Sequence, residues 1–304
     1  MTLHAELSQN ERFLWGLCYR MTGSAADADD LVQETFARAL KKPPSLDAPL
    51  RPWLTKVALN LARDGLRRRK RAPYPGPWLP APVETAAEVA VEPVSTEGRY
   101  DLLESVSFAF LLALEALTPK QRAVLLLRDV FEYSVRETAD ALGVSEDGVK
   151  TTHLRARRAV EAYDATRTLP TRAMRKRNQE ALEKLLSALL ADDVGQIERL
   201  LAASVRQLSD GGGEFLAARV PVVGPKKVAR LLLRLAQMRG VPSRAEIREV
   251  NGFAALVAEY AAVHSPNQAP KFVLRVEVDE GGLIREIHTV LATAKLSHVG
   301  QRYP

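Results

Sequence analysis

The chain has 304 residues, enough for two or three domains that each bury a core. Its 43 Lys and Arg exceed its 37 Asp and Glu, which favours a polyanionic partner. Its one cysteine, Cys18, excludes an internal disulfide, and no apolar run approaches the ~18 residues of a membrane span. We expect a cytoplasmic protein without a membrane contact, a metal or another cofactor.

Three helices are predicted within residues 1–71, which we interpret as the first domain. Ser8 and Glu11 are spaced as a capping box, and apolar residues then recur at helical spacing. A second helix opens at Ser24 and is ended by Pro43 and the proline that follows it. A third begins near Asp47, carries a continuous apolar stripe and ends in positive charge.

A proline-rich linker is predicted over residues 72–99. Between Ala72 and Gly98 there are six prolines and four glutamates but no Lys or Arg. A purely solvated spacer has little use for aromatic and apolar side chains. We therefore expect Tyr74, Trp78 and Leu79 to dock on another surface, and we assign Trp78, Leu79 and Pro80 to a regulatory linker.

Helices resume over residues 100–168, the second domain, with a helix-turn-helix at about 134–160. Ser134 begins a capping box, Gly143 supplies the tight turn, and Ser145 caps the second helix. Gly148 lies within that helix and costs ~1 kcal/mol relative to Ala. The expected core positions are Val149, His153, Ala156 and Val160. Six outward side chains would meet base edges or phosphates in a major groove: Asp147, Lys150, Thr151, Leu154, Arg155 and Arg158.

Residues 169–304 are predicted to form an α+β domain. A helix at about 174–191 and another after Pro225 accompany strand-like segments near 244–250, 253–262, 271–278 and 283–292. Asn251-Gly252 and Glu280-Gly281-Gly282 are typical of hairpin turns between strands. We expect helices packed on an antiparallel, curved sheet.

Two neighbouring helices of the first domain carry opposite charges. Asp27, Asp29, Asp30 and Glu34 make the second helix acidic, which would repel phosphate and suits a protein partner. The third helix ends in residues 63–71, which contain six cations and one anion. Earlier in the same helix, Trp53 can stack on an unpaired base and Asn60 can hydrogen-bond to one. This end is therefore a second candidate DNA contact.

These segments, in this order, resemble regions two and four of sigma factors of the extracytoplasmic-function type. The resemblance rests on residues 27–36, Trp53-Leu54, the arginine-rich run, residues 117–128 and the helix-turn-helix, and covers about the first 165 residues. It implies that the helix-turn-helix reads the upstream, minus-thirty-five promoter element. It also implies that Asp27, Asp30, Gln33 and Glu34 face core RNA polymerase, and that Trp53, Asn60, Arg63, Arg67 and Arg68 lie near the minus-ten element. Gly148 departs from the family, in which a better helix former is usual.

The C-terminal part is similar to SnoaL-like members of the cone-shaped fold shared with nuclear transport factor two. The linker segment 77–82 and the turn Asp210-Gly211-Gly212-Gly213 resemble two signatures of the sigma-factor subgroup that carries such a domain. A third signature, Asn-Pro-Asp-Lys-Leu, is represented only by Lys295 and Leu296. We hypothesise that Trp78 and Leu79 pin the linker to the first domain or the extension, and that Asp210 to Gly213 forms a rigid turn at their contact. The extension would then regulate the sigma domains.

Two other functions stay open from the sequence. The extension would be a cyclase or isomerase if its pocket held a small ligand and Asp210, Glu214, Glu259, His264 or His288 transferred protons. The helix-turn-helix would also serve a dimeric repressor, which needs a self-complementary surface and a palindromic site. Neither function uses the acidic and basic helices of the first domain. The prediction is therefore a sigma factor with no catalytic residue.

Overall fold

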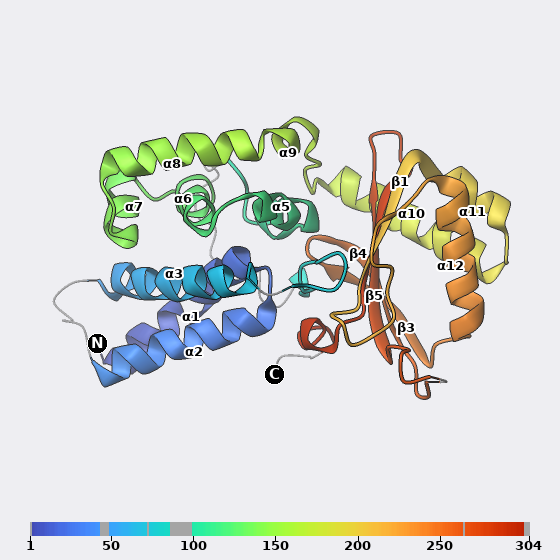
Figure 1. Cartoon of the computed structure of the whole chain (residues 1–304), viewed down its shortest axis with the longest axis horizontal. Helices are drawn as coiled ribbons and strands as arrows, with labels where there is room; N and C mark the ends of the chain where they lie inside the picture. Colours follow the sequence, from blue (N-terminus) through green and yellow to red (C-terminus); the bar gives the residue numbers. More distant parts are fainter. Residues whose placement is uncertain (1, 43–48, 72, 86–98, 264, 301–304) are drawn as a thin grey trace. The chain divides into compact units, whose positions relative to one another are not determined.

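The computed structural model describes residues 2–42, 49–71, 73–85, 99–263 and 265–300, in two compact units (Figure 1). The helical unit comprises Met1–Pro73 and Ala86–Arg167, and the α+β unit comprises Tyr74–Thr85 and Thr168–Pro304. Residues 74–85, which the sequence assigned to a linker, thus pack as part of the α+β unit. The rest of that predicted linker, residues 86–98, lies outside the described residues.

The first part of the helical unit is a bundle of α1 (Leu3–Thr22), α2 (Ala25–Lys41) and α3 (Leu50–Arg69). The predicted start of α1 at Ser8 is wrong. Because Leu7 is only 5% exposed, the apolar stripe begins before Ser8 and the helix extends back to Leu3. Gly23 ends α1 in a left-handed conformation, and the Ser24 hydroxyl caps α2 as predicted. The expected start of α3, near Asp47, lies outside the described residues.

The second part of the helical unit contains short helices around the predicted helix-turn-helix. Gly143 has a φ of 65°, which joins α7 to α8 in a tight turn. Ser134 and Thr118 both form complete capping boxes, and the Ser145 hydroxyl caps α8. The caps predicted at Ser134 and Ser145 are confirmed. The elements are η1 (Glu104–Val106), α5 (Phe108–Ala113), η2 (Leu114–Ala116), α6 (Pro119–Asp129), α7 (Val135–Leu142), α8 (Glu146–Ala159) and α9 (Glu161–Thr166).

Buried arginines join the two parts of the helical unit. The Arg20 guanidinium donates to the Ser105 hydroxyl over 2.7 Å, and Arg122 donates to the Met21 carbonyl over 2.9 Å. Arg122 also forms an ion pair with Glu115 at 2.7 Å. A guanidinium has five donors, so these contacts compensate for removing its charge from water. The predicted first and second domains therefore form one body in this structure.

The α+β unit is a six-stranded sheet with α10, α11 and α12 on one face (Figure 1). Its strand order is β2-β1-β6-β5-β4-β3, and β1 runs parallel to β6. The predicted antiparallel sheet is wrong for this pair, since the neighbouring strands β1 and β6 run in the same direction. The elements are α10 (Arg172–Leu190), α11 (Val194–Leu200), β1 (Leu201–Asp210), β2 (Val222–Val223), α12 (Pro225–Arg239), β3 (Arg244–Val250), β4 (Phe253–Glu259), β5 (Lys271–Val278), β6 (Ile284–Val290) and η3 (Thr293–Lys295).

The sheet has an apolar face under the helices and an opposite face on which charged and apolar side chains are mixed. Leu274 and Val276 of β5 belong to the core that includes Leu185 of α10 and Leu232 of α12. Side chains alternate along a strand, so Arg275 and its neighbour Glu277 occupy the other face. Asn251 and Gly252 have φ angles of 51° and 82°, which makes the tight hairpin expected between β3 and β4.

Candidate nucleic-acid interface

An acidic surface runs along the exposed side of α2. Asp27, Asp30, Gln33 and Glu34 are all exposed, at spacings that place them on one side of the helix. Glu34 also forms an exposed ion pair with Arg38, 2.9 Å long, one turn further on. The helix therefore offers carboxylates to a basic protein surface and repels the phosphates of DNA.

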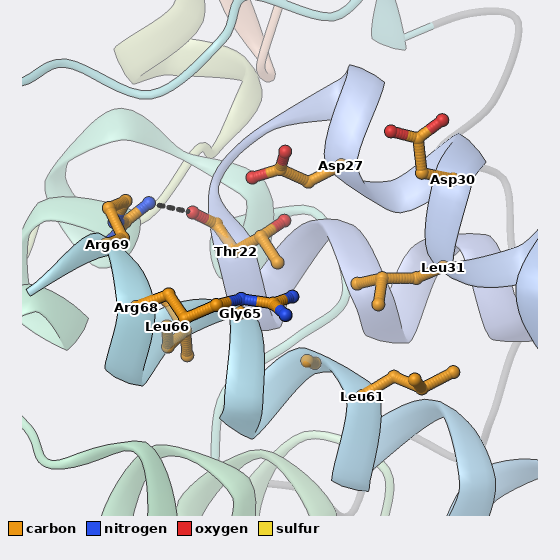
Figure 2. A pocket seen from close by; sticks show the side chains of 10 residues that line it. Thr22, Asp27, Asp30, Leu31, Leu61, Gly65, Leu66, Arg68 and Arg69 are labelled. Atoms are coloured by element: carbon orange, nitrogen blue, oxygen red, sulfur yellow. Dashed lines mark hydrogen bonds between the residues drawn. The ribbon is translucent and has the colours of Figure 1, made fainter.

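A pocket of about 390 Å³ lies between α2 and α3 (Figure 2). Asp27 and Asp30 come from α2, and the Arg68 side chain extends from α3 toward them. Leu31 and Leu61 add apolar lining. The pocket thus presents carboxylates and a guanidinium, and it suits a partner side chain that carries both an apolar stem and a polar end.

The basic end of α3 divides into exposed and internally bonded cations. Arg67 and Arg68 are exposed, as is Asn60, whereas Trp53 and Arg63 are half-buried. Two further cations of the same run are bonded inside the helical unit: Arg69 pairs with Glu115 at 2.7 Å, and Lys70 donates to the Leu117 carbonyl over 2.9 Å. Sequence reasoning did not separate these two groups, because their partners lie about 46 positions away.

The helix α8 presents the predicted outward side chains. Asp147, Lys150, Thr151, Leu154, Arg155 and Arg158 are all exposed, and Leu154 is 54% exposed despite being apolar. Asp147 and Lys150 pair with each other at 3.1 Å. On the opposite side Val149, Ala156 and Val160 are buried as predicted.

Asp129 at the end of α6 holds α8 in place, a role that sequence reasoning missed. Its carboxylate, 3% exposed, accepts hydrogen bonds from His153 over 2.9 Å and from Arg157 over 2.7 Å. Burial acts to raise the pKa of Asp129, but hydrogen bonds from His153 and Arg157 outweigh it and hold the pKa below its ordinary value. His153 is thus a hydrogen-bonded partner of Asp129 rather than a simple core residue.

In the α+β unit, the buried carboxylate of Asp210 binds the linker residues. Asp210 accepts a 2.5 Å hydrogen bond from the Tyr74 hydroxyl and a 2.7 Å hydrogen bond from the Leu79 backbone N–H. Lys295 pairs with the same carboxylate at 2.6 Å and donates to the Leu79 carbonyl over 2.5 Å. Its ammonium also lies 4.4 Å from the centre of the Trp78 ring. We call Asp210, Lys295, Tyr74, Trp78 and Leu79 the latch.

The glycines after Asp210 allow close packing around the latch. A Cβ on Gly211 would meet the Phe215 carbonyl oxygen at 2.4 Å, and one on Gly212 would meet the Ala292 side chain at 2.7 Å. A Cβ on Gly213 would meet the ring of the linker residue Pro75 at 2.9 Å. Side chains at these positions would displace neighbouring segments, so the three glycines are a steric requirement of the turn.

The linker continues past the latch along the sheet. Residues 79–83 are all buried. The Val83 backbone N–H donates to the Asn251 side-chain oxygen over 3.0 Å, and the Val83 carbonyl accepts from the Asn251 backbone N–H over 2.9 Å. The Glu84 carboxylate pairs with Arg248 at 2.5 Å. The polypeptide from Tyr74 to Thr85 is therefore an integral part of the α+β unit.

Among the described residues, each acid or base group considered for catalysis is bonded to a different partner. Glu214 is exposed and accepts hydrogen bonds from Thr293, whereas Glu259 pairs with Lys271 at 3.2 Å. His288 is fully buried and bonded to Glu286 over 2.9 Å, and His264 lies outside the described residues. Within the described ranges, no group of three or more His, Cys, Asp or Glu is arranged to hold a metal ion.

Known proteins match both units. A Sigma-70 region 2 family model matches residues 7–72, and a Sigma-70 region 4 model matches residues 107–160. The ECF RNA polymerase sigma factor SigJ of Mycobacterium tuberculosis is 34% identical over 238 residues, which are 78% of this chain and 74% of SigJ. The chain belongs to the family of ECF RNA polymerase sigma factors. SigG of the same organism is 35% identical over 63% of this chain and 57% of SigG.

The crystal structure of SigJ extends the likeness to the whole of this sigma factor. It matches with a TM-score of 0.74 at 28% identity and covers 97% of this chain and 99% of SigJ. The predicted fold class, two helical sigma domains followed by an α+β SnoaL-like domain, is confirmed, and so is the function of a sigma factor. Among the described residues, no helix is both long and apolar enough to cross a membrane.

Proposed function

We propose that this cytoplasmic sigma factor binds core RNA polymerase through α2, contacts promoter DNA through α3 and α8, and is regulated by its own α+β unit through the latch. One observation carries the regulatory part: linker residues between the two promoter-contacting regions are bound to the buried carboxylate of Asp210. We assign no catalytic role to the α+β unit.

The polymerase contact is argued from charge. The exposed carboxylates of α2 lie beside a pocket that also contains Arg68, and both features suit a helical partner with basic and acidic side chains. Replacing Asp30 and Glu34 by their amides should weaken binding to core polymerase by about tenfold, since each removes one charge pair across an interface. Core binding measured by gel filtration and fluorescence anisotropy tests this.

The matched control is a double variant that also removes two carboxylate charges, but from a different part of the helical unit. Asp140 and Glu146 are exposed carboxylates of the helix-turn-helix, outside the acidic surface of α2. Their amide variants should bind core polymerase as the parent does. Equal loss of binding in both double variants would contradict a role specific to α2.

The regulatory part follows from the length of chain between α3 and the region-four helices. Residues 74–85 are held in the α+β unit, so they are not available to span the gap between the two promoter contacts. Releasing these 12 residues would lengthen the tether by up to about 40 Å, at ~3.4 Å per residue. Because two DNA elements must be reached together, that extra length changes how often both contacts form.

Trp78→Ala tests the regulatory proposal. The substitution removes the ring that stacks with the Lys295 ammonium, but it leaves α2, α3 and α8 unchanged. We expect promoter-dependent transcription in vitro to change by at least threefold, while core polymerase binding stays nearly intact. Leu216→Ala, at an exposed loop position of the same unit, is the control. Unchanged transcription by Trp78→Ala would remove the proposal.

A further inference from the structure

Helix α12 lies in a segment from which acidic residues are missing. Between Glu214 and Glu246 there are seven Lys and Arg and no Asp or Glu. The formal net charge of the entire chain is +6, so this segment alone accounts for the excess of positive charge. The basic character noted for the whole chain is therefore concentrated in the α+β unit, outside the two sigma regions.

Four of these cations form one continuous surface, which we call the α12 stripe: Lys226, Lys227, Arg230 and Arg234. They are all the exposed residues of positions 225–234. Within the part of the chain that the structure describes, no ion pair joins any of them to a carboxylate. By contrast, Arg244 of the same segment pairs with Glu246 at 2.7 Å. The stripe is thus available for an anionic partner.

The burial pattern of α12 excludes insertion of this helix into a membrane interface. Val228, Ala229 and Leu232 are buried in the core of the α+β unit. A helix that lies in a membrane interface must turn its apolar face toward lipid. In α12 this face is already covered by protein, and the exposed side carries the four cations of the stripe together with Gln237 and Met238.

The composition of the stripe favours nucleic acid over a protein partner. Protein interfaces are anchored by buried aromatic or large apolar side chains, and the exposed residues of positions 225–234 include none. The exposed apolar side chain of α12, Met238, lies one turn beyond Arg234. The stripe from Lys226 to Arg234 spans nine residues, or about 12 Å of helix. Duplex DNA carries a charge every ~3.4 Å along each strand, so this length matches about three phosphates.

We propose that the α12 stripe is a third DNA contact of this sigma factor, which binds the phosphates of duplex DNA without reading its sequence. The contact is electrostatic, since Lys and Arg donate to phosphate oxygens whatever the bases are. It adds to affinity and to the rate of association with DNA, while α3 and α8 remain the sequence-dependent contacts.

The test compares two triple variants of the full chain with equal changes of charge. Lys227, Arg230 and Arg234 are replaced by Gln in one, and the exposed α10 residues Arg172, Lys176 and Lys184 in the other. Binding to a 30-base-pair duplex without promoter sequence is measured by anisotropy between 50 and 300 mM salt, without polymerase. Each lost phosphate contact lowers the slope of log K against log salt concentration by ~0.9.

The stripe variant should lower the slope by about 2 to 3 and weaken binding at least tenfold at 100 mM salt, whereas the α10 variant should match the parent. Equal slopes in both variants would overturn the proposal. Normal DNA binding by the stripe variant with reduced transcription by the holoenzyme would also overturn it, and would indicate an acidic protein partner. The readout involves neither promoter nor polymerase, so it is independent of the function proposed above.

A cysteine-directed crosslink gives a second measurement that does not depend on affinity. Cys18 is the chain's one cysteine and is 1% exposed, so a new surface cysteine is the accessible thiol. A photocrosslinker at Gln237→Cys, beside the stripe, should label the duplex, and one at Ser187→Cys on α10 should not. Equal labelling from both positions would contradict the proposed contact.

Discussion

Asp210 is a buried carboxylate that binds groups from three separate segments of the chain. It accepts hydrogen bonds from Tyr74 and Leu79 of the linker, from Gly212 of its own turn, and from Lys295 near the C-terminal end. Removing one member of a buried ion pair leaves the other charge without compensation, at a cost of about 3 kcal/mol or more. The latch is therefore sensitive to single substitutions.

Lys295→Met should lower the free energy of unfolding of the α+β unit by about 3 kcal/mol. Combined with Asp210→Asn, which removes the second charge, the loss should be smaller than the sum of the two single losses by at least about 1 kcal/mol. Urea denaturation of the full chain measures this cycle. Lys271→Met, which breaks a partly exposed pair with Glu259, is the control and should cost about 1 kcal/mol or less. Additive losses would contradict a coupled pair.

Asp129→Asn should destabilise the helical unit by about 2 kcal/mol at pH 7 and weaken binding to the upstream promoter element. The pKa of Asp129 is lower in the folded state, because hydrogen bonds from His153 and Arg157 outweigh the effect of burial. The carboxylate thus contributes stability above the unfolded-state pKa, ~3.9, and loses it as pH falls through the folded-state value.

The stability difference between the parent and Asp129→Asn should therefore be full at pH 5 to 7 and shrink below about pH 4. Chemical denaturation at a series of pH values measures it. The exposed Asp140→Asn variant should show no such dependence. A difference that stays constant from pH 6 to pH 3 would rule out the charged form of Asp129 as its source.

At the scale of single elements, two helix glycines have different surroundings. Gly65 in α3 has no atom within 4 Å of the place where a Cβ would lie, apart from its chain neighbours and the backbone of its own helix. In α8, a Cβ on Gly148 would lie 3.1 Å from the Ser145 hydroxyl, which caps the helix by accepting from the Gly148 N–H. Replacing glycine by alanine stabilises the helix at both positions, but only at position 148 does the added methyl group crowd the capping hydroxyl.

Gly65→Ala should raise the free energy of unfolding by about 1 kcal/mol, and Gly148→Ala by less than half of that. Guanidinium denaturation of the two variants measures the difference. Ser145→Gly is the control background: Gly still caps a helix, but it has no side chain for the new methyl group at position 148 to crowd. If the two alanine variants gain equally, the cap does not constrain position 148.

Element prediction from the sequence succeeded where the local signal and the tertiary fold agree. The turn at Asn251-Gly252 places both residues at positive φ, which few other residue pairs tolerate, and this marked the β3–β4 hairpin. The start of α1 was mispredicted because Ser8 and Glu11 have the spacing of a capping box. Leu7 is buried, however, and the helix begins before it, at Leu3. The parallel β1–β6 pair has no local signature, because it depends on which distant strands meet.

At the scale of the whole molecule, a truncated chain tests the dependence of the linker on the C-terminal part. In a chain ending at Arg167, residues 79–83 lose the buried surroundings that they have in the α+β unit. We expect proteases to cleave within residues 74–85 of the shorter chain at least tenfold faster than in the full chain, because exposed extended segments are readily cleaved. Mass spectrometry of limited digests locates the cuts. Equal protection in both chains would contradict the assignment.

The outward residues of α2 and α8 could be predicted because helical spacing places them without knowledge of the rest of the fold. The contact between the linker and Asp210 was only hypothesised, and its partner domain was left open. Lys295 completes the latch from 216 residues away in sequence, and periodicity cannot reveal such a contact. Arg69 and Lys70 looked like DNA contacts for the same reason, since Glu115 and Leu117 lie beyond the linker.

The discontinuous make-up of the α+β unit has a consequence for synthesis of the protein. Translation at ~5–20 residues per second separates the emergence of Leu79 from that of Lys295 by roughly 10 to 40 s. The helical unit is complete by Arg167, so the nascent chain has both regions proposed to contact the promoter before its linker can be bound. We expect a premature stop between Arg167 and Lys295 to release an unregulated sigma factor rather than to abolish one.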